Sequence, residues 1–228
     1  ETIEYNLQGL KVRAQAVNGL ITTWSYDSQG RVLEETVGGS ICKRATYSTF
    51  HLLSESDPSG LTTYYEYDRA GRKISEKKGQ HILRYEYDTL GRLSKLSGHT
   101  STTLYRYDDL DRLIEESCFT ADNDPVTHKK YIWDANGRKT HTYTETDAGW
   151  VVEEKRYNSK GDIVWHKDAA GSLTLTNFNY NYYNASGQRV PCHEMIDPMG
   201  QRLVTVMDAL GRVESLKRYS PTGLLLQQ

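Results

Sequence analysis

The sequence is poor in the residues that build compact cores and in those that form redox or metal sites. Its 228 residues include only three Cys, three Met and three Phe, and 37% of the residues are hydrophobic. Cys42, Cys118 and Cys192 are widely spaced and form no CxxC pair, which argues against a disulfide framework and against a zinc site. We expect reduced thiols that serve as packing residues.

Long apolar runs and charge of one sign are also missing. The longest purely aliphatic run is Leu224 to Leu226, so we expect no membrane span. The net charge is −2 and both signs are interspersed, so the charge pattern predicts neither a nucleic-acid footprint nor a membrane-binding face. The start, Glu1 to Tyr5, has no signal-peptide features and no initiator Met, so we expect an excised piece of a longer polypeptide without its own signal peptide.

The motifs of common catalytic sites are absent as well. The sequence contains no HExxH, GxGxxG, GxxxxGK or GxSxG, and no His pairs with a Cys at ligand spacing. Consecutive acids such as Glu115 and Glu116 face opposite sides of a strand and therefore do not form a glycosidase pair. We predict no enzymatic activity, no cofactor and no metal.

Tyrosine, by contrast, occurs 17 times and marks a repeat. The unit is an aromatic residue, Asp, two variable residues, Gly and Arg, with Met207 in the aromatic position of one copy. The residues that carry it are Tyr26, Asp27, Gly30 and Arg31; Tyr67, Asp68, Gly71 and Arg72; Tyr87, Asp88, Gly91 and Arg92; Tyr107, Asp108 and Arg112; Trp133, Asp134, Gly137 and Arg138; and Asp208, Gly211 and Arg212.

The spacing of the repeat is regular in one half of the chain and looser in the other. The leading aromatics are 20 or 21 residues apart up to position 107 and 24 to 26 residues apart from about 108 onward. The extra residues, around 120–125 and 146–149, indicate longer turns. No linker interrupts the pattern, so we expect a single repeat array over residues 1–228 with no second domain.

Each copy has the residue order of a β-hairpin turn. The aromatic closes a strand, the Asp side chain accepts backbone N–H bonds from residues further along the turn, and the Gly supplies a positive φ. Between turns lie strand pairs such as 72–78 and 81–87, and no stretch keeps helical spacing. The sequence therefore predicts an all-β fold, an extended antiparallel sheet of tandem hairpins.

Neighbouring units should align the aromatics Tyr67, Tyr87 and Tyr107 into a ladder, in which cross-strand pairs are worth about 0.2–1 kcal/mol each. The motif arginines should pair with the motif Asp or lie over a Tyr ring. A structural role is favoured over ligand binding, because a turn residue is needed in every repeat and a catalytic residue only once.

The Tyr-Asp-x-x-Gly-Arg unit resembles the YD repeats of the bacterial Rhs family, which also occur in the B and C components of insecticidal Tc toxins and in animal teneurins. The similarity runs from Tyr5 to Gly223. It implies a curved sheet that spirals into a hollow shell, which in bacterial members encloses a toxic C-terminal domain of the same polypeptide. It also implies a structural segment of a secreted or cell-surface protein, with the rest of that polypeptide and the toxin domain as partners.

A second hypothesis is an extracellular module that binds carbohydrate or a cell-surface partner. Exposed aromatic rings stack on sugars, and Tyr143, Trp150 and Trp165 are the candidate contacts. This hypothesis predicts an exposed aromatic cluster at one place, whereas a shell segment predicts no dominant pocket.

Overall fold

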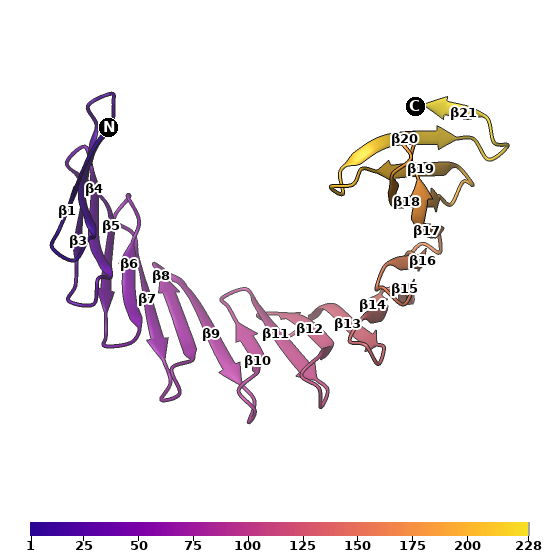
Figure 1. Cartoon of the computed structure of the whole chain (residues 1–228). Coiled ribbons are helices and arrows are strands. Elements are labelled where there is room, and N and C mark those ends of the chain that lie inside the picture. Colours follow the sequence, from indigo (N-terminus) through magenta and orange to yellow (C-terminus); the bar gives the residue numbers. More distant parts are fainter. Residues whose placement is uncertain (228) are drawn as a thin grey trace. The chain divides into compact units, whose positions relative to one another are not determined.

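The computed structural model describes residues 1–227, which form one antiparallel sheet of 21 strands and contain no helix. Strands that follow one another in the chain pair with one another, as β7 with β8 and β8 with β9 (Figure 1). The predicted all-β fold of consecutive hairpins is confirmed. The strands are β1 Thr2–Tyr5, β2 Lys11–Gln15, β3 Ile21–Tyr26, β4 Val32–Val37, β5 Ser40–Tyr47, β6 Leu52–Ser56, β7 Thr62–Tyr67, β8 Lys73–Lys78, β9 His81–Tyr87, β10 Leu93–Ser97, β11 Ser101–Tyr107, β12 Leu113–Thr120, β13 Pro125–Trp133, β14 Lys139–Thr146, β15 Gly149–Tyr157, β16 Ile163–Lys167, β17 Leu173–Tyr183, β18 Arg189–Ile196, β19 Arg202–Met207, β20 Val213–Tyr219 and β21 Leu225–Gln227.

Two compact units make up the chain. The first contains Glu1–Leu104 and Cys118–Asp124, and the second contains Tyr105–Ser117 and Pro125–Gln228. Within the first, β1 to β10 lie side by side in chain order (Figure 1). Within the second, β13 to β21 pair in the same sequential way. The single array over residues 1–228 stays a prediction.

The turn after each leading aromatic is built by its Asp and Gly. The Gly30 N–H donates to the Asp27 carbonyl at 3.1 Å, and the Asp27 N–H donates to the Arg31 carbonyl at 2.9 Å. Oδ1 of Asp27 accepts the N–H groups of Gln29 and Arg31, both at 2.9 Å. Gly30 has the predicted positive φ, at 79°. These bonds satisfy the backbone groups of the turn without help from the sheet.

One irregularity accompanies these turns. Tyr67 pairs with Lys73 while Glu66 pairs with Ser75, so Ile74 is an extra residue in the return strand. A register shift also occurs at Tyr26 in β3 and at Trp133 in β13. Such β-bulges bend a strand and increase its local twist.

The sheet has very little dry core. Among the described residues, the buried apolar side chains are Ala45, Val190 and Val206. Thr63 and Thr205 are also buried. Most strand residues are half-buried, as expected for a tyrosine-rich, phenylalanine-poor sheet whose aromatic rings have one dry face and a polar end. The stability of the array therefore depends on contacts between neighbouring repeats.

Residues 1–227 contain no helix long and apolar enough to cross a membrane.

Candidate functional site

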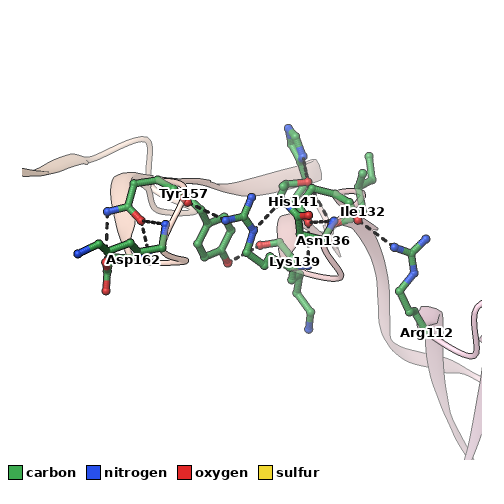
Figure 2. Close-up of polar contacts among 12 residues, drawn as sticks. Arg112, Ile132, Asn136, Lys139, His141, Tyr157 and Asp162 are labelled. Carbon is green, nitrogen blue, oxygen red and sulfur yellow. Dashed lines mark hydrogen bonds and ion pairs between the residues drawn. The ribbon is translucent and has the colours of Figure 1, made fainter.

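The motif arginine links its own turn to the next one. In the second unit, Nε of Arg138 lies 2.6 Å from Oδ2 of Asp134, the motif aspartate of the same turn. Its Nη1 donates to the backbone carbonyl of Asn158 in the following turn at 2.8 Å. Its guanidinium carbon lies 5.0 Å from the centre of the Tyr157 ring. Nη1 of Arg112 likewise donates to the carbonyl of Asp134 at 2.9 Å (Figure 2).

The leading aromatic in turn donates a hydrogen bond to a backbone carbonyl of the preceding repeat. The hydroxyl of Tyr157 donates to the Lys139 carbonyl at 2.7 Å (Figure 2). Nε1 of Trp133 donates to the Leu113 carbonyl at 2.8 Å. The indole of Trp133 thus takes the role of the tyrosine hydroxyl and bonds to a carbonyl at the same position of the repeat. Lys139 and Leu113 each follow the motif arginine of the preceding repeat. We call this two-way contact the arginine–aromatic clasp.

The clasp recurs in the first unit. The guanidinium carbon of Arg31 lies 4.4 Å from the centre of the Tyr47 ring, and that of Arg72 lies 4.6 Å from the Tyr87 ring. The Tyr87 hydroxyl donates to the Lys73 carbonyl at 2.7 Å. The sequence suggested an arginine that pairs with Asp or covers a ring, and in the structure it does both. In these two repeats a guanidinium therefore lies over the leading aromatic of the next repeat, and the ladder of Tyr67, Tyr87 and Tyr107 stays a prediction.

In two degenerate repeats, a residue other than arginine contacts a tyrosine of the next repeat. The ring of His51 stacks on Tyr67, with centroids 4.5 Å apart, in a turn that has no motif arginine. In the repeat led by Tyr157, Asp162 replaces the arginine and accepts the hydroxyl of Tyr180. The side-chain amide of Asn158 also donates to that hydroxyl at 2.7 Å. Imidazole and carboxylate thus substitute locally for guanidinium.

A second polar layer was not foreseen from the sequence. Tyr65, two residues before a leading aromatic, donates its hydroxyl to Glu55 at 2.8 Å, and Tyr131 donates to Glu116 at 3.0 Å. Burial, reinforced by the neighbouring glutamate, raises the pKa of each of these tyrosines to about 12. Lys139 lies over the Tyr131 ring, 3.9 Å from its centre. In the sequence, each of these tyrosines stands two residues before the leading aromatic of its repeat, and that spacing was the only sign of the second layer.

The motif aspartates are held ionised by their turns. The backbone N–H of Arg138, followed by that residue's side chain, lowers the pKa of Asp134. At Asp57, the Ser59 hydroxyl and then Lys78 lower the pKa to about 2. The charged form of each carboxylate is therefore the form that the folded turn binds.

Acid should destabilise the array through these turns. A carboxylate whose pKa is lower in the folded state contributes stability above its unfolded pKa of about 3.9, and that stability is lost as the pH falls through the folded value. The urea midpoint should therefore drop between about pH 4 and pH 2, the window set by the pKa of about 2 at Asp57. Asp57→Asn should flatten part of this profile, and an unchanged slope in that variant would contradict the assignment.

The three candidate carbohydrate contacts lie on one face of the second unit. Tyr143 in β14 is paired directly with Val152 in β15, and Trp150 lies two residues before Val152 in β15. Trp165 is paired with Arg156, four residues after Val152, so the pleat places it on that face too. The register of β14 to β16 therefore brings together residues that the sequence could only suggest one by one.

Tyr143 and Trp150 also line one depression of about 610 Å³. Its other lining residues are the apolar Ile114, Ile132 and Val152, together with Tyr131, Arg106, Glu115 and Lys130. Trp165 does not line it and instead stacks with Arg156, whose guanidinium carbon is 4.4 Å from the ring centre. Trp150 is 41% exposed, with Lys130 5.0 Å from its ring centre. Two of the three predicted aromatics therefore share a concave surface.

Across residues 1–227, no group of three or more His, Cys, Asp or Glu side chains is arranged to hold a metal ion. The three cysteines are free thiols with half-buried side chains.

No protein-family model and no curated protein matches this sequence. Among solved structures, the crystal structure of TcdB2-TccC3 without its hypervariable C-terminal region matches 95% of the chain, with a TM-score of 0.55 and 15% identity. The TcdB2-TccC3-Cdc42 structure matches 98%, with a TM-score of 0.56 and 14% identity. This chain has the fold of a segment of TcdB2-TccC3.

That match confirms, for the fold, the resemblance to Tc-type proteins that the repeat motif predicted. A further TcdB2-TccC3 crystal structure matches 95% of the chain, again with a TM-score of 0.56 and 14% identity. The chain spans 15 to 18% of the length of these TcdB2-TccC3 chains.

Proposed function

We propose that this chain is a structural, non-catalytic segment of the shell of a larger bacterial Rhs/Tc-like secreted toxin, and that the shell encloses a toxic C-terminal domain. The observation that carries the proposal is the fold shared with TcdB2-TccC3 over nearly the whole chain. The chain's short span relative to those proteins fits a segment whose partners are the rest of its own polypeptide and the enclosed domain.

The way the sheet is held together also supports the shell proposal. The sheet of a shell can be thin, but its neighbouring strands must not slide past one another. Here few side chains are fully buried, and clasps bind successive turns, as Arg112 and Arg138 do one after the other. Motif arginines and aspartates repeat along the array, which is the expected distribution for structural residues and not for a catalytic set.

The shell proposal is tested on the complete parent polypeptide. Electron microscopy should reveal a hollow particle, and its C-terminal domain should resist a protease that digests the same domain expressed alone. Export to the medium or the cell surface should be found by fractionation. A C-terminal domain that is cut equally fast in both contexts would overturn the proposal.

A carbohydrate-binding role is the second candidate, and the shared depression favours it. Tyr143 and Trp150 provide aromatic faces for sugar stacking, and Arg106, Glu115 and Lys130 supply hydrogen-bonding groups in the same depression. A volume of about 610 Å³ is in the range of small-molecule sites, roughly 300–1,000 Å³. Trp165 stands apart from this group and serves as the comparison residue.

Trp150→Ala should abolish binding to any oligosaccharide that the purified chain retains on a glycan array. Trp165→Ala, on the same face but outside the depression, should leave that binding within about twofold, because less than ~0.5 kcal/mol is expected from a side chain remote from the site. A blank array with a well-folded sample would exclude this second function.

A further inference from the structure

The depression that contains Tyr143 and Trp150 presents positive charge at its surface. All of its lining residues belong to the second unit. Among them, the side chain of Arg106 is 74% exposed and that of Lys130 is 50% exposed, whereas that of the acid, Glu115, is 19% exposed. The charged groups that a ligand meets in this depression are therefore mainly a guanidinium and an ammonium.

Both carboxylate oxygens of Glu115 are already occupied by neighbouring side chains. Oε2 accepts Nη1 of Arg106 at 2.9 Å, and Oε1 lies 2.6 Å from Nε2 of His128 and 4.0 Å from Nζ of Lys130. The hydrogen bond with His128 lowers the pKa of Glu115. The other ring nitrogen of His128 contacts Glu145, which does not line the depression. One carboxylate is thus shared by two cations, which leaves a net positive charge for a ligand to neutralise.

The rest of the lining is apolar or aromatic. It consists of Ile114, Ile132, Val152, Tyr131, Tyr143 and Trp150. The imidazole of His128 lies edge-on to Trp150, with ring centroids 5.0 Å apart and an interplanar angle of 67°. Nζ of Lys130 lies 5.0 Å from the centre of the same indole ring. A positioned aromatic ring, a cation and an apolar patch therefore stand next to one another.

These three features match three different groups of one class of sugar. A carboxylate pairs with the exposed cations, because guanidinium groups bind carboxylates through charge-assisted hydrogen bonds. The C–H face of a sugar ring packs on an exposed aromatic ring such as that of Trp150. A methyl group suits the patch formed by Ile132 and Val152, where a hydroxyl would be left without a partner. A neutral sugar without an N-acetyl group uses only the aromatic ring.

We propose that this depression binds a sugar that carries both a carboxylate and an N-acetyl group. The carboxylate accepts hydrogen bonds from Arg106 and lies near Lys130, the sugar ring lies on Trp150, and the acetamido methyl packs against Ile132 and Val152. This inference rests on the carbohydrate-binding function proposed as the second candidate, and it names the class of ligand for that site.

The experiment compares three probes on the purified chain. The terminal sugar of sialyllactose carries both groups, sulfated lactose carries an anion but neither of them, and lactose is neutral. Binding is followed by NMR titration, in which the indole N–H of Trp150 reports on the depression and that of Trp165 on the same face outside it. We expect sialyllactose to shift the Trp150 signal and to bind at least about fivefold more tightly than lactose, the effect of one charge-assisted hydrogen bond. Sulfated lactose should fall between the two.

A matched pair of variants tests the role of the guanidinium. Arg106→Gln should weaken sialyllactose at least about fivefold and leave lactose within about twofold, because only the anionic probe uses this residue. Arg156→Gln removes the same charge from the same face, beside Trp165 and outside the depression, so it should change none of the three affinities by more than about twofold. The amide spectrum of each variant verifies that it is folded.

Two outcomes would overturn this inference while leaving carbohydrate binding intact. Sialyllactose and lactose could bind equally well, or sulfated lactose could match sialyllactose, which would make the depression a general anion site. If none of the three probes shifts the Trp150 signal, the carbohydrate-binding function itself fails together with the inference. The comparison of probes on the parent chain decides between these results even if Arg106→Gln does not fold.

Discussion

Replacing Arg138 by alanine should lower the free energy of unfolding by about 1–3 kcal/mol, the range for losing a cation–π contact together with a charge-assisted hydrogen bond. The substitution removes the Nη1 bond to the Asn158 carbonyl and the cover over the Tyr157 ring. The ion pair with Asp134 adds little, because both side chains keep contact with solvent, at 25% and 22% exposure. Urea denaturation followed by circular dichroism measures the change.

Two matched variants identify the cause of this loss. Arg212→Ala removes the same type of ion pair from a side chain that is 74% exposed, so it should cost well under half as much as Arg138→Ala. Arg138→Lys keeps the charge but cannot place a planar group over the ring while bonding in two directions, and it should not restore the midpoint. Equal costs for Arg138→Ala and Arg212→Ala would show that the clasp contributes nothing beyond the ion pair.

Gly91→Val should also cost about 1–3 kcal/mol, because a β-branched residue is forced into a left-handed backbone conformation. Gly91 has φ 87°, and a Cβ there would lie 3.3 Å from Nη1 of Arg72. The new side chain therefore strains the turn and also pushes Arg72, which lies over the Tyr87 ring. The midpoint of urea unfolding is again the measurement.

Other positions in the array separate strain from crowding. Gly211 has φ 78°, and its Cβ would meet nothing within 4 Å, so Gly211→Val reports the backbone strain alone. Gly91→Asp should be milder than Gly91→Val, because Asp111 occupies the same motif position with φ 61°. If all three variants unfold at the parent midpoint, the positive φ at these turns is not an energetic requirement.

Short-range features were predictable because a few consecutive residues contain all the chemistry they need. The Asp27 side chain and Gly30 build their turn within five residues, so the pattern alone indicates its place and its positive φ. The ends of strands followed from the same logic, since β7 ends at Tyr67 and β9 at Tyr87. The absence of helical periodicity completed the prediction of fold class.

For contacts between repeats, the sequence indicated the types of residue involved but not which residues pair. An arginine and a tyrosine in each unit suggested a stack, but the partner of Arg72 is Tyr87 in the following repeat and not Tyr67 in its own. An extra residue, Ile74 in β8, also shifts the pairing of β8 with β7, and no motif marks it. The hydrogen bond from Tyr65 to Glu55 depends on the pairing of β6 with β7.

The candidate carbohydrate site shows the same division. Composition singled out Tyr143, Trp150 and Trp165 as aromatics outside the leading positions. Only the pairing of β14 with β15 and of β15 with β16 placed them on one face, and only the packing around Ile132 made a depression that includes two of them. Side-chain distances across strands depend on register, and a sequence period of about 20 residues does not specify register to the single residue.

The sequence by itself determined the repeat, its turns and its all-β character, because each turn is closed by an Asp, a Gly and their own backbone. The tertiary structure decided which ring each arginine covers, where the bulges fall and which motif arginine is left exposed. Those outcomes involve residues about 20 positions apart in the chain, and their positions depend on strand pairing and twist. The exposed Arg212 is therefore visible only in the folded molecule, although it follows the same Asp-x-Leu-Gly turn as Arg92.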